Sequence, residues 1–106
     1  MAFFKKTYNQ LLEEAIDILI KIKENVKENS DCVWTSYESA TEIHNDIDKY
    51  ISHLEKRDTD IIDEAYSHFL PTSTYQEHSM TNNWTKEYYK LAAKFDKIYE
   101  HIKNCR

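Results

Sequence analysis

The stretch HFLPTSTYQEHSMTNNW, residues 68–84, interrupts a chain that otherwise shows helical periodicity almost throughout. It contains Pro71, the only proline among 106 residues. The residue before a proline is disfavoured in the α conformation, so a helix that enters this stretch is expected to end by Leu70. Helical periodicity resumes near Asn83. Residues 71–83 are therefore predicted to form a long connection between two helices.

On both sides of this connection, apolar residues recur at alternating spacings of three and four, the pattern of helices packed along one face. The first helix is predicted over residues 6–29 and the last over residues 83–104. The second is expected to begin at a capping box of Thr35 and Glu38, with Trp34 before it as a hydrophobic staple, and to extend through Leu54. The third is predicted from Thr59 or Asp60 to Leu70.

Four amphipathic helices predict an all-α fold, an antiparallel up-down-up-down four-helix bundle with a short third helix and a long helix 3–4 connection. A chain of this length is expected to form one domain over residues 1–106. The third helix is too short to extend along the full length of the bundle, so residues 71–83 are expected to cover the end that it leaves open. Tyr75, Met80 and Trp84 are the predicted buried anchors of this cover. A capping box of Ser73 with Gln76, or of Thr74 with Glu77, predicts a short helical turn within it.

Composition narrows the function. The chain contains no glycine, which disfavours phosphate-cradling loops and nucleotide cofactors. Its formal net charge is -5 with no basic block, so no nucleic acid partner is expected. Apolar runs are too short for a membrane span, and no membrane association is predicted. Cys32 and Cys105 are predicted to be free thiols in a reducing cytoplasmic compartment.

Three side chains near the connection, Glu64, His68 and His78, are of the types that bind zinc or iron. The paired Glu-x-x-His motifs of di-iron bundles and the His-Glu-x-x-His zinc motif are both absent from the sequence. We therefore predict no metal, no cofactor and no catalytic residues, and a non-enzymatic protein is favoured.

Aromatic residues supply the remaining signal. Eight tyrosines are present, and tyrosine is enriched at protein interfaces. The residues predicted to contact a partner are Tyr37, Tyr75, Tyr89 and Trp84. The favoured hypothesis is a helical-bundle protein that binds another protein or itself, with a homodimer formed through the first or last helix. One alternative is an acidic inhibitor of the immunity or antitoxin type that neutralises a basic partner. A second is a metal- or ligand-binding bundle with its site under residues 71–83.

Overall fold

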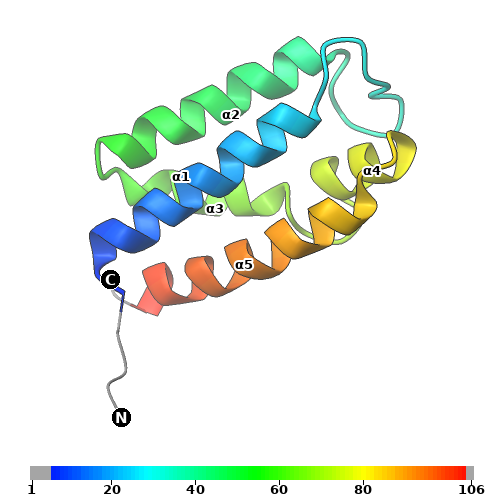
Figure 1. Ribbon diagram of the computed structural model, residues 1–106. Coiled ribbons are helices and arrows are strands. Elements are labelled where there is room, and N and C mark those ends of the chain that lie inside the picture. The colour runs from blue at the N-terminus through cyan, green and yellow to red at the C-terminus, as the bar shows by residue number, and fades with distance from the viewer. Residues whose placement is uncertain (1–5, 105–106) are drawn as a thin grey trace.

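The computed structural model describes residues 6–104 and confirms that this part of the chain is all-α, with no strand (Figure 1). Cys105 lies outside the described residues. The elements in chain order are α1 (Tyr8–Asn25), α2 (Ala40–Glu55), the 3-10 helix η1 (Thr59–Ile61), α3 (Ile62–Ser67), α4 (Thr74–Thr81) and α5 (Thr85–Asn104). None of the described helices is both long enough and apolar enough to cross a membrane.

The start of α2 differs from the sequence prediction. Ser39 is the N-cap, and its hydroxyl accepts a hydrogen bond from the backbone N–H of Glu42. The Thr35 hydroxyl instead donates to the carbonyl of Cys32, 2.8 Å away, within a turn. The predicted capping box at Thr35 and the staple at Trp34 are therefore wrong. Since α1 also ends earlier than predicted, at Asn25, residues 26–39 form a long loop.

The third predicted helix is shorter than expected and is followed by an additional helix. After η1, α3 ends at Ser67, and a hydrogen bond from the Ser73 N–H to the Leu70 carbonyl then closes a turn around Pro71. The helical turn predicted in the connection is confirmed as α4. Neither predicted capping box holds it, because Ser73 makes no side-chain cap hydrogen bond and Thr74 bonds to His68.

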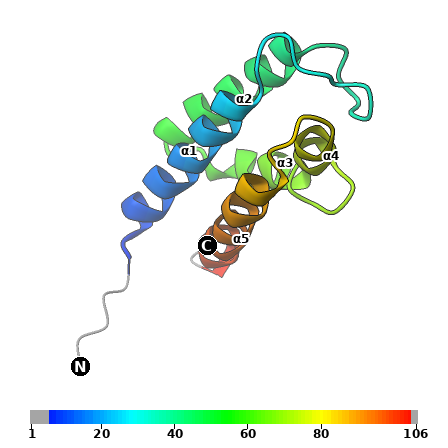
Figure 2. The same cartoon turned by 45° about the vertical axis from the view of Figure 1, so that its right-hand side comes forward.

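The core lies where α1 packs against α2 and α5, while α3 contacts α2 and α5 from the other side (Figures 1 and 2). Its fully buried aliphatic and aromatic side chains include Leu12, Leu19, Ile22, Ile43, Ile47, Tyr50, Leu54, Ile62, Tyr75, Phe95 and Ile102. The helix α4 packs on α5 near the end at which α1 finishes.

Two of the three predicted anchors in the connection are buried, namely Tyr75 and Trp84. The third, Met80, is 56% exposed, so its prediction as a buried anchor is wrong. The buried positions of α4 are Thr74, Tyr75, His78 and Ser79. They follow helical spacing, and Met80 falls outside that face.

Candidate functional site

The loop formed by residues 26–39 joins α1 to α2 and lies at one end of the molecule, beside α4 (Figure 1). Side chains from α2, α4 and the segments around them hold this loop at its start, middle and end. We refer to residues 26–39 as the α1–α2 loop.

The start of the loop is held by His44 on α2. Its Nε2 atom lies 2.5 Å from the carbonyl oxygen of Val26. A carbonyl oxygen only accepts hydrogen bonds, so His44 Nε2 must carry the proton and donate it. The Val26 N–H in turn donates to the carbonyls of Ile22 and Lys23 at the end of α1. The chain is therefore fixed where it leaves the helix.

The middle of the loop is held by His78 and Asn82 at the C-terminal end of α4. Asn82 makes two hydrogen bonds with the backbone of Asp31, from the Asp31 N–H at 2.9 Å and to the Asp31 carbonyl at 2.8 Å. His78 Nε2 lies 2.8 Å from the hydroxyl of Ser30, and its Nδ1 lies 2.9 Å from Nε1 of Trp84. The indole N–H of Trp84 only donates, so His78 Nδ1 must accept and Nε2 must carry the proton.

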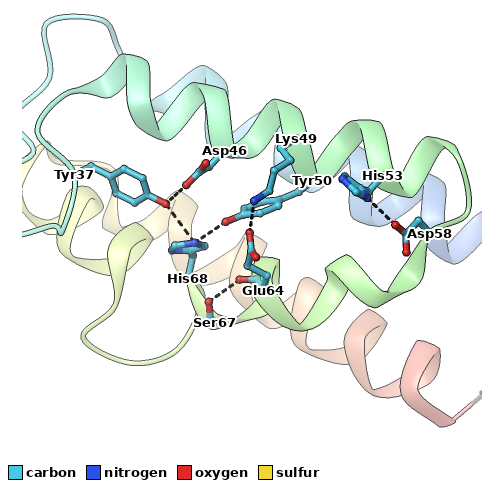
Figure 3. Close-up of polar contacts among 9 residues, drawn as sticks. All are labelled: Tyr37, Asp46, Lys49, Tyr50, His53, Asp58, Glu64, Ser67 and His68. Atoms are coloured by element: carbon cyan, nitrogen blue, oxygen red, sulfur yellow. Dashed lines mark hydrogen bonds and ion pairs between the residues drawn. The ribbon is translucent and has the colours of Figure 1, made fainter.

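The end of the loop is held by Tyr37, which enters a polar cluster between α2 and α3 (Figure 3). The Tyr37 hydroxyl donates to the Asp46 carboxylate at 2.5 Å and lies 3.4 Å from His68 Nε2. His68 Nε2 is also 2.8 Å from the Tyr50 hydroxyl, and His68 Nδ1 is 2.8 Å from the Thr74 hydroxyl. Through His68, the loop is thereby linked to both α2 and α4.

This cluster is kept uncharged by burial, apart from the Asp46 carboxylate. Burial raises the pKa of Tyr37, Tyr50 and Tyr75 above the usual range of a phenol, and the hydrogen bond to Asp46 adds to the effect on Tyr37. Burial also lowers the pKa of His68 and of His78. His68, His78 and the three phenols are therefore neutral at pH 7 and act through hydrogen bonds.

Between these attachment points, the loop exposes two large apolar side chains. Val33 is 66% exposed and Trp34 is 71% exposed, although Cys32 beside them is buried. Burial is also the main reason that the pKa of the Cys32 thiol is raised, so this free cysteine remains a thiol rather than a reactive thiolate. We refer to Val33 and Trp34 together as the loop tip.

The four residues predicted to contact a partner differ in their surroundings. Tyr75 and Trp84 are buried in the core, and therefore offer no surface to a partner in this structure. Tyr37 is partly buried in the polar cluster. Tyr89 is 53% exposed, and its hydroxyl accepts a hydrogen bond from the side-chain amide of Gln76. Its role in binding stays a prediction, and so does that of Tyr37.

The three candidate metal ligands do not converge. Glu64 is paired with Lys49 at 2.8 Å, and His68 contacts tyrosines (Figure 3). His78 instead contacts Ser30 and Trp84. Within residues 6–104, no group of three or more histidine, cysteine, aspartate or glutamate side chains is arranged to hold a metal ion.

An interaction role for the loop tip was not predicted from the sequence. The signal was present, because Val33 and Trp34 are adjacent apolar residues within the polar stretch ENSDCVWTSYES, residues 28–39. The apparent capping box of Thr35 and Glu38 instead led to the prediction that Trp34 packs inward as a hydrophobic staple. Asn82 was also missed, since nothing in its local sequence indicates a partner 51 positions away.

Comparison of the chain with protein-family models, with curated proteins and with solved structures finds no match. Function must therefore be argued from the residues and contacts described above.

Proposed function

We propose that this chain is a non-enzymatic protein-binding protein of the cytoplasm. In this proposal α1, α2, α3 and α5 form an antiparallel four-helix bundle that presents the loop tip to a protein partner. The observation that carries the proposal is the 71% exposure of Trp34 on a loop that is held on both sides by hydrogen bonds.

Two physical arguments favour this role for the loop tip. Tryptophan is among the residues that contribute most to binding energy at protein interfaces, because one rigid side chain buries a large area. A loop that is already ordered also loses less conformational entropy when it binds. The bonds from Asn82 and Tyr37 provide that order on either side of Trp34.

The charge of the loop favours a basic partner, which keeps an acidic inhibitor of the immunity or antitoxin type as a second candidate function. Within residues 26–39, Lys27 is the only basic side chain, whereas Glu28, Asp31 and Glu38 are acidic. The whole chain has a net charge of -5. Acidic groups around an apolar contact speed its association with a basic surface. This electrostatic attraction weakens as salt is added.

Affinity capture with matched variants tests the proposal. The immobilised protein is compared with Trp34→Ser and with Ile20→Ser, which removes an apolar side chain that is 42% exposed on α1. We expect the parent and Ile20→Ser to retain the same protein and Trp34→Ser to lose it. Retention of that protein by Trp34→Ser, or no capture by the parent, would contradict the proposal. Sensitivity of the captured complex to salt separates a basic partner from a neutral one.

A further inference from the structure

A groove of about 840 Å³ runs between α1 and α5, away from the loop tip. The two helices run in opposite directions, so the first turns of α1 lie beside the last turns of α5 (Figure 1). Four apolar side chains line the floor, namely Leu11 and Ile18 from α1 and Leu91 and Ile98 from α5. Each of these four side chains is already buried, so the solvent-exposed surface of the groove is formed mainly by the polar side chains along its edges.

The two edges of the groove differ in charge. The α1 edge carries Glu14 and Asp17, which form ion pairs with Lys6 and Lys21. The α5 edge carries Lys94 and Lys97, for which the described part of the chain shows no ion pair within 4.0 Å.

One atom on the α1 edge lacks a partner. Glu14 Oε2 is shielded from solvent and has no hydrogen-bond partner among the described residues, whereas Glu14 Oε1 binds Lys6. A shielded carboxylate oxygen without a donor is unfavourable, because it has lost water without replacing it. The groove therefore combines unpaired donors on one edge with an unpaired acceptor on the other.

A second copy of this chain satisfies both edges at once. If two chains face each other across a two-fold axis parallel to the groove, the α5 edge of each lies over the α1 edge of the other. This axis does not shift positions along the groove, so Lys94 and Lys97 of each chain stay level with the Glu14 and Asp17 carboxylates of its partner. We propose that the protein forms a symmetric homodimer through the α1–α5 groove, with Lys94 and Lys97 of each chain paired to Glu14 and Asp17 of the other.

The size of the face predicts a weak dimer. α1 has 18 residues and is therefore roughly 27 Å long at about 1.5 Å per residue. Two adjacent helices about 10 Å in diameter give a projected face on the order of 500 Å², below the ~800 Å² per partner of a standard interface. With little apolar area on the floor, the association should lie in the micromolar range and weaken with salt. The same axis places both loop tips at one end of the dimer, so this inference extends the proposed function to bivalent binding.

Two oppositely charged variants provide the test. Lys94→Glu/Lys97→Glu places carboxylates on the α5 edge opposite Glu14 and Asp17 of the partner, and Glu14→Lys/Asp17→Lys leaves only lysines opposite Lys94 and Lys97. The control, Lys27→Glu/Lys56→Glu, has the same charge change as the first variant at positions outside the groove. Sedimentation equilibrium across the micromolar range measures the dimer constant. We expect dimers of the parent and the control, and at least about tenfold weaker association of each groove variant alone.

Mixing gives the decisive result, because the acidic variant and the basic variant are complementary to each other. We expect the mixture to form heterodimers at concentrations at which each variant alone remains monomeric. Circular dichroism verifies folding, and Lys94→Gln/Lys97→Gln replaces the acidic variant if that variant unfolds. A parent that remains monomeric, or a dimer that the groove variants leave unchanged, would overturn the inference. Neither result affects the capture experiment on Trp34, so the proposed function and the dimer fail separately.

Discussion

Acidification should loosen the α1–α2 loop through protonation of His78, and the substitution His78→Gln should prevent that loosening. His78 Nδ1 accepts from Trp84 Nε1–H at 2.9 Å, so a proton on Nδ1 would bring two donors together. Glutamine is able to reproduce the neutral pattern, with its oxygen accepting from Trp84 and its amide donating to Ser30. It does so without a group that becomes charged in this pH range.

The magnitude follows from proton linkage. An unfolded histidine titrates near pH 6.5, and burial lowers the pKa of His78 in the folded protein. The stability is therefore intact above about pH 6.5 and falls as the unfolded state takes up a proton that the folded state excludes. The loss reaches at most about 1.4 kcal/mol per pH unit and ends at the folded pKa of His78. His68, whose pKa burial also lowers, adds a loss of the same sign.

Urea denaturation at several pH values between about pH 7.5 and pH 5 measures this dependence. The free energy of unfolding of the parent should decrease as the pH is lowered. For His78→Gln, the decrease per pH unit should be smaller by up to about 1.4 kcal/mol. The double variant with His68→Gln should be flatter still. A parent whose stability is constant over this range, or a His78→Gln slope equal to that of the parent, would refute the reasoning.

Three further predictions address other parts of the fold. Above about pH 10 the stability should fall, because the pKa values of Tyr37, Tyr50, Tyr66, Tyr75 and Tyr88 are raised in the folded state; phenolate absorbance should then appear together with unfolding. Thr72→Gly should raise the free energy of unfolding by about 1 kcal/mol, measured by urea denaturation, since Thr72 has a φ of 61° in the turn after Pro71. Asn82→Ala should speed amide exchange across residues 30–34 but not in α1, because it removes both bonds to Asp31; equal protection in the two proteins would contradict this role.

The helices were predictable to the extent that their periodicity was strong. The stripes of α1 and α5 place Leu12, Leu19, Phe95 and Ile102 correctly in the core. The α2 boundary was not predictable, because Thr35 with Glu38 and Ser39 with Glu42 both fit the sequence pattern of a capping box. The partners of Asn82 and His78 lie 51 and 48 positions away, beyond any local pattern. The loop that exposes Trp34 depends on those distant bonds, so its geometry was not available from sequence.

The abundance of tyrosine also has a structural explanation that composition cannot supply. Three phenols donate to carboxylates on other elements, in the pairs Tyr37 with Asp46, Tyr66 with Asp96 and Tyr99 with Asp63. Such a phenol packs its ring against neighbouring residues while its hydroxyl remains bonded.

These hydrogen bonds affect which exposed aromatic side chains indicate a binding surface. A tyrosine whose hydroxyl is bonded within the chain makes a structural contact whether or not it also binds a partner, as Tyr89 does with Gln76. Trp34 is different, because it is 71% exposed although the loop on both sides of it is fixed by specific bonds. Holding a large apolar side chain in water does not stabilise the fold. The proposal of a binding surface at the loop tip therefore rests on the ordered exposure of Trp34 and not on the number of tyrosines.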